Sequence, residues 1–168
     1  MALGFNEFQT WINEYALRLE ALKDILNDLD NRIGDGDHGT NMARGFLVAN
    51  QQLQSKSHAD LGSACNTVAM ALLSNVGGAS GPLYGTVFMK LGGALKNLQS
   101  ADDGKLLEGL LSAKQRNTYR YIRNPVNFTP YLTIYFAILM NNSIIHPALS
   151  QFGTHFNFDV KGLGGKIC

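Results

Sequence analysis

The sequence predicts an all-α protein, and three observations support that fold class. Apolar residues recur in steps of three and four over long stretches of residues 1–113, which is the spacing of one face of a helix. No segment there alternates apolar and polar residues as a half-buried strand does. Two glycine-rich segments, at residues 34–39 and 77–82, interrupt the pattern where helices are expected to end. Together these features indicate a bundle of helices joined by two glycine-rich loops.

Five helices are expected, in this order. The first covers residues 5–29, where steps of three and four alternate through Phe5, Phe8, Ile12, Tyr15, Leu19, Leu22, Leu26 and Leu29. The second runs from Thr40 to about Leu53. The third follows Asp60, a good N-cap, and ends near Asn75. The fourth begins at about Pro82, because the first turn of a helix tolerates proline, and continues to Leu98; the fifth covers 103–111.

The composition limits the class of protein. A chain of 168 residues suits one domain or at most two small ones, and 45% apolar with 16% charged residues argues against disorder throughout. The net charge of +1 gives no overall field that would favour nucleic acid or an acidic membrane surface. Two cysteines cannot form a disulfide scaffold or a zinc site alone. We find neither a signal peptide nor 18 consecutive apolar residues, and expect a cytoplasmic protein without membrane contact.

The averages hide a change along the chain. Residues 1–113 hold 8 basic and 12 acidic residues, a net charge of −4, whereas residues 114–168 hold 6 basic and 1 acidic, a net charge of +5. The last 55 residues also contain 9 of the 16 aromatic residues. We therefore expect a helical domain over 1–113 and an atypical tail over 114–168.

The first glycine-rich loop carries three carboxylates. Asp30, Asp35 and Asp37 lie within eight residues, with His38 beside them. Such carboxylates repel one another unless cations hold them, and Mg²⁺ prefers a few carboxylates together with substrate phosphates. A solvated acidic turn is an equally good explanation of the pattern alone, because Asp and Gly are common in turns.

The second loop, residues 77–82, has no charged side chain, so any chemistry there would come from the backbone. Small residues let N–H groups approach an anion, the following helix adds its positive end, and Ser80 offers a hydroxyl. A plain turn between helices is the simpler explanation of a glycine cluster. Thr40 and Asn41 could likewise bind phosphate or cap their own helix. Taken together, the two loops describe a site for a magnesium–nucleotide complex.

Two long segments carry a resemblance to a known family. Residues 29–46, LDNRIGDGDHGTNMARGF, closely resemble the signature of the nucleotide-binding L-subunit family of dihydroxyacetone kinases, and residues 73–86, LSNVGGASGPLYGT, resemble its second signature. The resemblance covers about residues 1–111. It implies an antiparallel barrel of eight helices with the nucleotide at one end.

The resemblance also implies a site and partners. It implies two Mg²⁺ ions held by Asp30, Asp35 and Asp37. It implies contacts to ADP or ATP from His38, Gly39, Thr40, Asn41, Ala79 and Ser80. It further implies a kinase subunit that passes a phosphoryl group to dihydroxyacetone on a separate K subunit, with a phosphoryl-donor subunit of the phosphotransferase type recharging the nucleotide. No catalytic residue is assigned in this chain, because the substrate-linked histidine belongs to the K subunit.

The tail departs from the family. The family has a Gly-Asp-Lys-Thr loop and a later loop rich in arginine and glycine, and residues 114–168 contain neither. A divergent end, a truncation with a substituted end, and a reading-frame shift would each explain this, and the change in composition favours a frame shift or an aberrant end. The alternative function is then a non-catalytic remnant that acts as a helical interaction module. We expect the chain alone to bind ADP weakly or not at all.

The remaining residues of note have structural explanations. Cys65 is expected to be inert core on the apolar side of a helix. Trp11, Phe5 and Phe8 are also expected in the core. The other histidines, which have no supporting neighbours, are expected at the surface or in packing contacts: His58, His146 and His155.

Overall fold

The computed structural model describes residues 2–32 and 34–121. The elements in chain order are β1 (Leu3–Gly4), α1 (Phe5–Asp30), α2 (His38–Ser55), α3 (Leu61–Asn75), α4 (Ser80–Ala94), β2 (Ser100–Ala101) and α5 (Asp103–Tyr121). The all-α class and the five helices expected within 1–113 are confirmed. The predicted barrel has eight helices, and the described residues contain five. The rest of that prediction, and most of the predicted tail, lie outside the described residues.

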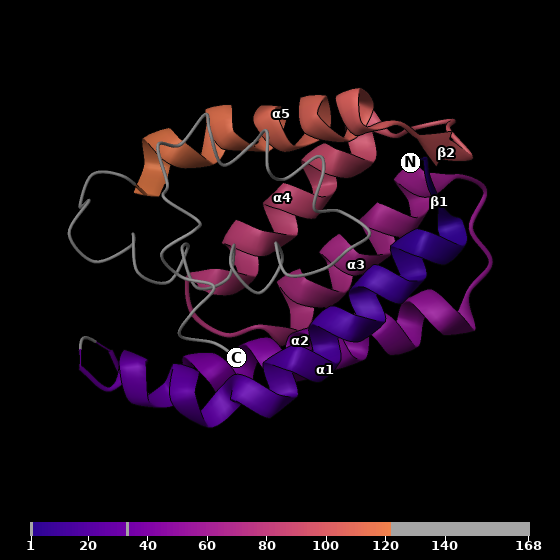
Figure 1. The fold of residues 1–168 in the computed structure, drawn as a ribbon. Coiled ribbons are helices and arrows are strands. Elements are labelled where there is room, and N and C mark those ends of the chain that lie inside the picture. Colours follow the sequence, from indigo (N-terminus) through magenta and orange to yellow (C-terminus); the bar gives the residue numbers. More distant parts are fainter. Residues whose placement is uncertain (1, 33, 122–168) are drawn as a thin grey trace.

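Successive helices pack against one another in chain order, so α2, α3 and α4 each lie between their sequence neighbours (Figure 1). The α1–α2 and α3–α4 connections, which are the two glycine-rich loops, lie at one end of the bundle. The α2–α3 and α4–α5 connections lie at the other end, beside β1 and β2. This topology brings the two loops to the same end although α2 and α3 lie between them in the sequence.

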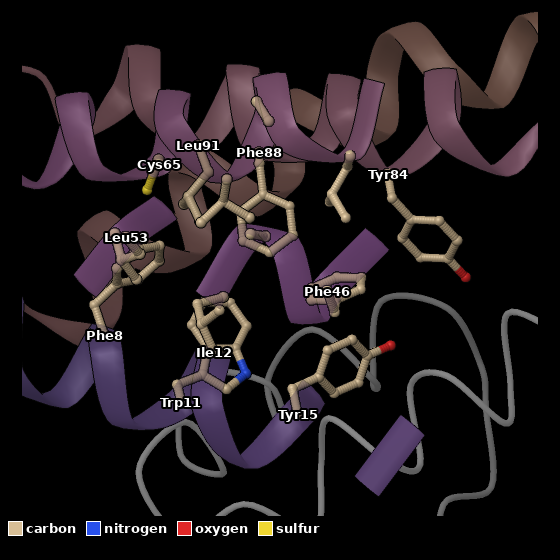
Figure 2. Packing of buried hydrophobic residues seen from close by; sticks show 14 of the residues in the cluster. Phe8, Trp11, Ile12, Tyr15, Phe46, Leu53, Cys65, Tyr84, Phe88 and Leu91 are labelled. Atoms are coloured by element: carbon tan, nitrogen blue, oxygen red, sulfur yellow. The ribbon is translucent and has the colours of Figure 1, made fainter. Parts of the chain in front are cut away.

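The apolar stripes form a continuous core. Phe8, Ile12, Leu19 and Leu26 of α1 are at most 1% exposed, as their spacing predicts. Aromatic rings fill the space between α1, α2 and α4, where Tyr15 and Phe46 meet edge to face with their centroids 4.5 Å apart (Figure 2). Burying one such side chain stabilises the fold by roughly 1.5–3 kcal/mol. This core underlies the end of the bundle that carries the two loops.

Both ends of α4 differ from the prediction. The helix ends at Ala94 rather than Leu98, and it begins at Ser80, two residues before Pro82. Proline is still accommodated there, because the first N–H groups of a helix have no partner within it. The antiparallel pair that joins Leu3 to Ala101 and Gly4 to Ser100 was not predicted, since two-residue strands are too short to show alternation.

The cysteine and aromatic residues that were expected in the core are buried there or pack against it. Cys65 is fully buried, and burial raises the pKa of its thiol. Trp11 and Phe8 are core residues, and Phe5 packs against the core. The His58 ring lies 5.3 Å from that of Phe5, centroid to centroid. His146 and His155 lie outside the described residues. None of the helices that the structure describes combines the length and apolar character needed to cross a membrane.

Candidate functional site

The first loop is shaped by Asp30, the last residue of α1. Its carbonyl accepts a hydrogen bond from Gly34 N–H at 2.6 Å, and its Oδ2 accepts one from Gly36 N–H at 2.9 Å. Gly36 has φ +76°, and a Cβ there would overlap the Asn31 side chain. Only glycine therefore fits this turn, which folds the loop back over the end of α1.

The three acidic side chains converge. One carboxylate oxygen each from Asp30, Asp35 and Asp37 lies within 4.8 Å of the others, with Asp30 half-buried and the other two exposed. The structure thus brings together the three residues that the sequence singled out. Three negative charges at this separation repel one another, and oxygen ligands of this kind suit a hard divalent cation. Their role as metal ligands stays a prediction.

The start of α2 lies directly beside these acids. Thr40 N–H donates to Asn27 Oδ1 at 3.0 Å, and Asn27 Nδ2 donates to Thr40 Oγ1 at 2.9 Å. Gly39 is buried against α1, and a Cβ there would overlap the carbonyl oxygen of Lys23. Gly39 and Thr40 therefore join α2 to α1, and their predicted contacts with ADP stay predictions.

Asn41 connects the two loops through Arg44. Arg44 Nη2 donates to Asn41 Oδ1 at 2.6 Å, and Arg44 Nε donates to the carbonyl of Asn75 at 3.2 Å. Asn75 is the last residue of α3. A Cβ on Gly77 would lie 3.2 Å from Asn41 Nδ2, so the second loop passes close to this amide. One guanidinium thus bridges the start of α2 and the end of α3.

The second loop turns tightly into α4. Gly78 has φ +62°, and a Cβ there would meet no atom within 4 Å, so this part of the loop borders open space. A Cβ on Gly81 would overlap the carbonyl oxygen of Val76. Helix geometry leaves the N–H groups of Ser80 and Gly81 without partners inside α4. The loop therefore offers backbone donors and the positive end of a helix, as expected for an anion site.

His38 and Ser80 meet between the loops, with Ser80 Oγ 3.2 Å from His38 Nδ1. Burial lowers the pKa of the His38 imidazole, and this outweighs the raising effect of the carboxylates of Asp30, Asp37 and Asp35. His38 is consequently neutral at pH 7 and can act as a hydrogen-bond donor at one nitrogen and an acceptor at the other. The site thus places a neutral ring, rather than a cation, beside the acids.

Three residues of this region were not singled out from the sequence: Asn27, Arg44 and Asn75. Each has a hydrogen-bond partner at least 13 residues away, and such a partner is not revealed by periodicity. The available signal for Asn27 was a polar residue on the flank of the α1 stripe, directly after Leu26.

Comparison with known proteins agrees with this geometry. The model of the DAK2 domain matches residues 32–129, more than half of the chain and including both loops. The chain belongs to the DAK2 domain family. The resemblance drawn from the two signatures is thereby confirmed.

This chain spans about half the length of the relatives that it matches. The ADP-binding subunit DhaL of PEP-dependent dihydroxyacetone kinase 1 from Listeria innocua is 47% identical over 85 residues, which are 51% of this chain and 43% of that protein. The DhaL subunit of the PTS-dependent kinase from Lactococcus lactis is 37% identical over 106 residues, 63% of this chain and 54% of that protein. The Escherichia coli DhaL subunit is 38% identical over 100 residues, 60% of this chain and 48% of that protein.

Proposed function

We propose that this chain binds a nucleoside diphosphate with Mg²⁺ between its two glycine-rich loops and serves as the ADP-binding subunit of a dihydroxyacetone kinase. The observation that carries the proposal is the convergence of the Asp30, Asp35 and Asp37 oxygens next to a loop that offers backbone donors. One loop has the charge that a cation needs and the other has the donors that an anion needs. The names of the relatives supply the identity of the nucleotide.

The residues fit a magnesium ion by their chemistry. Carboxylate oxygens are the ligands that Mg²⁺ prefers, and Asp30 is held in place by the Gly36 amide. Mg²⁺ bound there would neutralise charge on the phosphate oxygens of a nucleotide. The chain's own contribution is positioning: Asp30 is fixed by the loop, Ser80 and His38 hold the two loops together, and Arg44 orients Asn41.

Transfer of the phosphoryl group needs other subunits in this proposal. Dihydroxyacetone would be held by a K subunit, and a phosphoryl-donor subunit of the phosphotransferase type would recharge the nucleotide. Support comes from the names of the relatives, which describe PEP- and PTS-dependent kinases. A cytoplasmic location and a magnesium pair, rather than a single ion, belong to the same proposal.

Thermal unfolding with and without ligand tests the binding step. Mg²⁺ with ADP at 100 times its Kd is expected to raise the unfolding midpoint by about 8 °C, because binding to the native state stabilises it. The Asp35→Asn/Asp37→Asn variant should lose this shift. As a control, Asp24→Asn/Asp28→Asn removes two charges from the exposed side of α1 and should keep it. A shift that survives in the first variant would remove the metal assignment.

A non-catalytic helical module is the second candidate. The observation that favours it is the lack, in residues 114–168, of the two further loops of the family. It predicts no ADP-dependent stabilisation at any magnesium concentration. The intermediate outcome, binding with a Kd above about 1 μM, would agree with an ADP site that lacks part of its cover.

A further inference from the structure

The aspartate at the start of α2 does not cap its own helix. Asp37 occupies the N-cap position, where an aspartate ordinarily accepts a hydrogen bond from the second or third N–H of the helix. Here the Asp37 side chain makes no such bond. The third N–H, that of Thr40, donates instead to Oδ1 of Asn27 in α1 at 3.0 Å.

The amide of Asn27 is held by two bonds. Its Nδ2 donates to Thr40 Oγ1 at 2.9 Å while its Oδ1 accepts from Thr40 N–H, so the orientation of the amide is fixed by both contacts. A Cβ on Gly39 would lie 2.9 Å from Asn27 Oδ1 and would overlap the carbonyl oxygen of Lys23. Glycine at 39 is thus what lets α1 come close enough to cap α2.

Capping by Asn27 leaves the Asp37 carboxylate available. A carboxylate bonded to Thr40 N–H would be turned over the first turn of α2, whereas here an Asp37 oxygen lies within 4.8 Å of oxygens of Asp30 and Asp35. We propose that Asn27 is a positioning residue, which caps α2 from the neighbouring helix and so leaves Asp37 to the acidic cluster. What the released carboxylate then binds rests on the proposed function.

A double-mutant cycle on stability, in EDTA, tests the capping step without metal. In the otherwise unchanged chain, Asp37→Ala should leave the unfolding midpoint unchanged or raise it, because one of three repelling charges is removed. In the Asn27→Ala background Asp37 can take over the cap, so Asp37→Ala should then lower the midpoint by about 5 °C. Equal effects in the two backgrounds would overturn the proposal.

Two further variants complete the cycle. Asn27→Asp keeps an oxygen for Thr40 N–H, so Asp37→Ala should again have no cost there. Asp60→Ala removes the side chain that does cap α3 and should lower the midpoint in every background, which shows that the measurement detects a lost cap. If Asn27→Ala does not fold, the comparison of Asp37→Ala with Asp60→Ala still decides, because equal losses would mean that Asp37 caps its own helix.

Calorimetric titration with Mg²⁺ alone tests the consequence. Asn27→Ala should weaken Mg²⁺ binding about 10- to 100-fold, the usual effect of losing a residue that orients a metal ligand. Unchanged Mg²⁺ affinity would overturn the positioning role. If the unchanged chain does not bind Mg²⁺, the proposed function fails at its metal, while the metal-free cycle still reports on whether Asn27 caps α2.

Discussion

Helices α2 and α3 both begin after an aspartate, and the two aspartates have different surroundings. Asp60 Oδ1 accepts from Ser63 N–H and Oδ2 accepts from Asn97 N–H, both at 2.6 Å, so its carboxylate joins α3 to the α4–α5 connection. Asp37 caps nothing and lies with two other acids. Asp60 therefore caps its own helix, whereas Asn27 of α1 accepts the hydrogen bond from Thr40 N–H at the start of α2. The comparison shows that the residue before a helix need not be its cap when a neighbouring helix supplies one.

The largest effect on stability is expected at Gly39, whose lack of a side chain lets α1 and α2 approach each other. Gly39→Ala places a methyl group against the backbone oxygen of Lys23, so the helices must separate where Asn27 meets Thr40. Overpacking of this kind should lower the unfolding midpoint by about 10 °C. Gly93→Ala is the matched control, because a Cβ there meets no atom within 4 Å and alanine favours a helix. Equal midpoints for the two variants would show that the close approach is unimportant.

A smaller effect is expected from Arg44, which bridges the two loops. Arg44→Gln should weaken ADP binding roughly tenfold while the midpoint without ligand changes little, because the contacts of Arg44 are exposed. Arg44→Lys should not restore affinity, since an ammonium cannot reproduce the planar fork that reaches two acceptors. The exposed Lys56 provides a control for charge, and Lys56→Gln should bind ADP normally. Full affinity in Arg44→Lys would assign the effect to charge alone.

The smallest effect concerns pH at the other end of the bundle. The hydrogen bonds from the Ser63 and Asn97 amides lower the pKa of Asp60 below its ordinary value of 3.8. A lowered pKa in the folded state means that Asp60 stabilises the fold above pH 3.8 and that this contribution disappears as the pH falls through the folded value. The unfolding midpoint of Asp60→Asn should therefore lie below that of the unchanged chain at pH 7. The two midpoints should approach each other as the pH falls below 3.8, as followed by circular dichroism. A constant difference at all pH values would contradict this.

The sequence predicts local features well. Most of the stripe from Phe8 to Leu26 is buried, Asp60 caps α3, and the acids of the first loop converge. Each of these depends on neighbours within a few turns, so spacing is informative. The convergence of the acids also depends on Gly36, because its left-handed backbone conformation favours glycine.

Contacts across the bundle were not predictable in the same way. Asn27 and Thr40 are 13 residues apart, and Arg44 and Asn75 are 31 apart. Nothing in the local spacing of polar residues says which of them will face a partner on another helix. Gly39 likewise lies against the backbone and side chains of α1, which local spacing did not indicate, and its contact with a nucleotide, which the resemblance implies, stays a prediction.

The indole of Trp11 gives the chain an internal optical reporter. It is the single tryptophan of the sequence, it is 4% exposed, and its ring centroid lies 5.6 Å from that of Phe8 and 5.9 Å from that of Phe88 (Figure 2). A tryptophan with so little exposure to water emits at short wavelength, and its emission shifts to longer wavelength when unfolding exposes it to water. Emission from the interior of the folded chain can therefore be read without a label and without perturbing either loop.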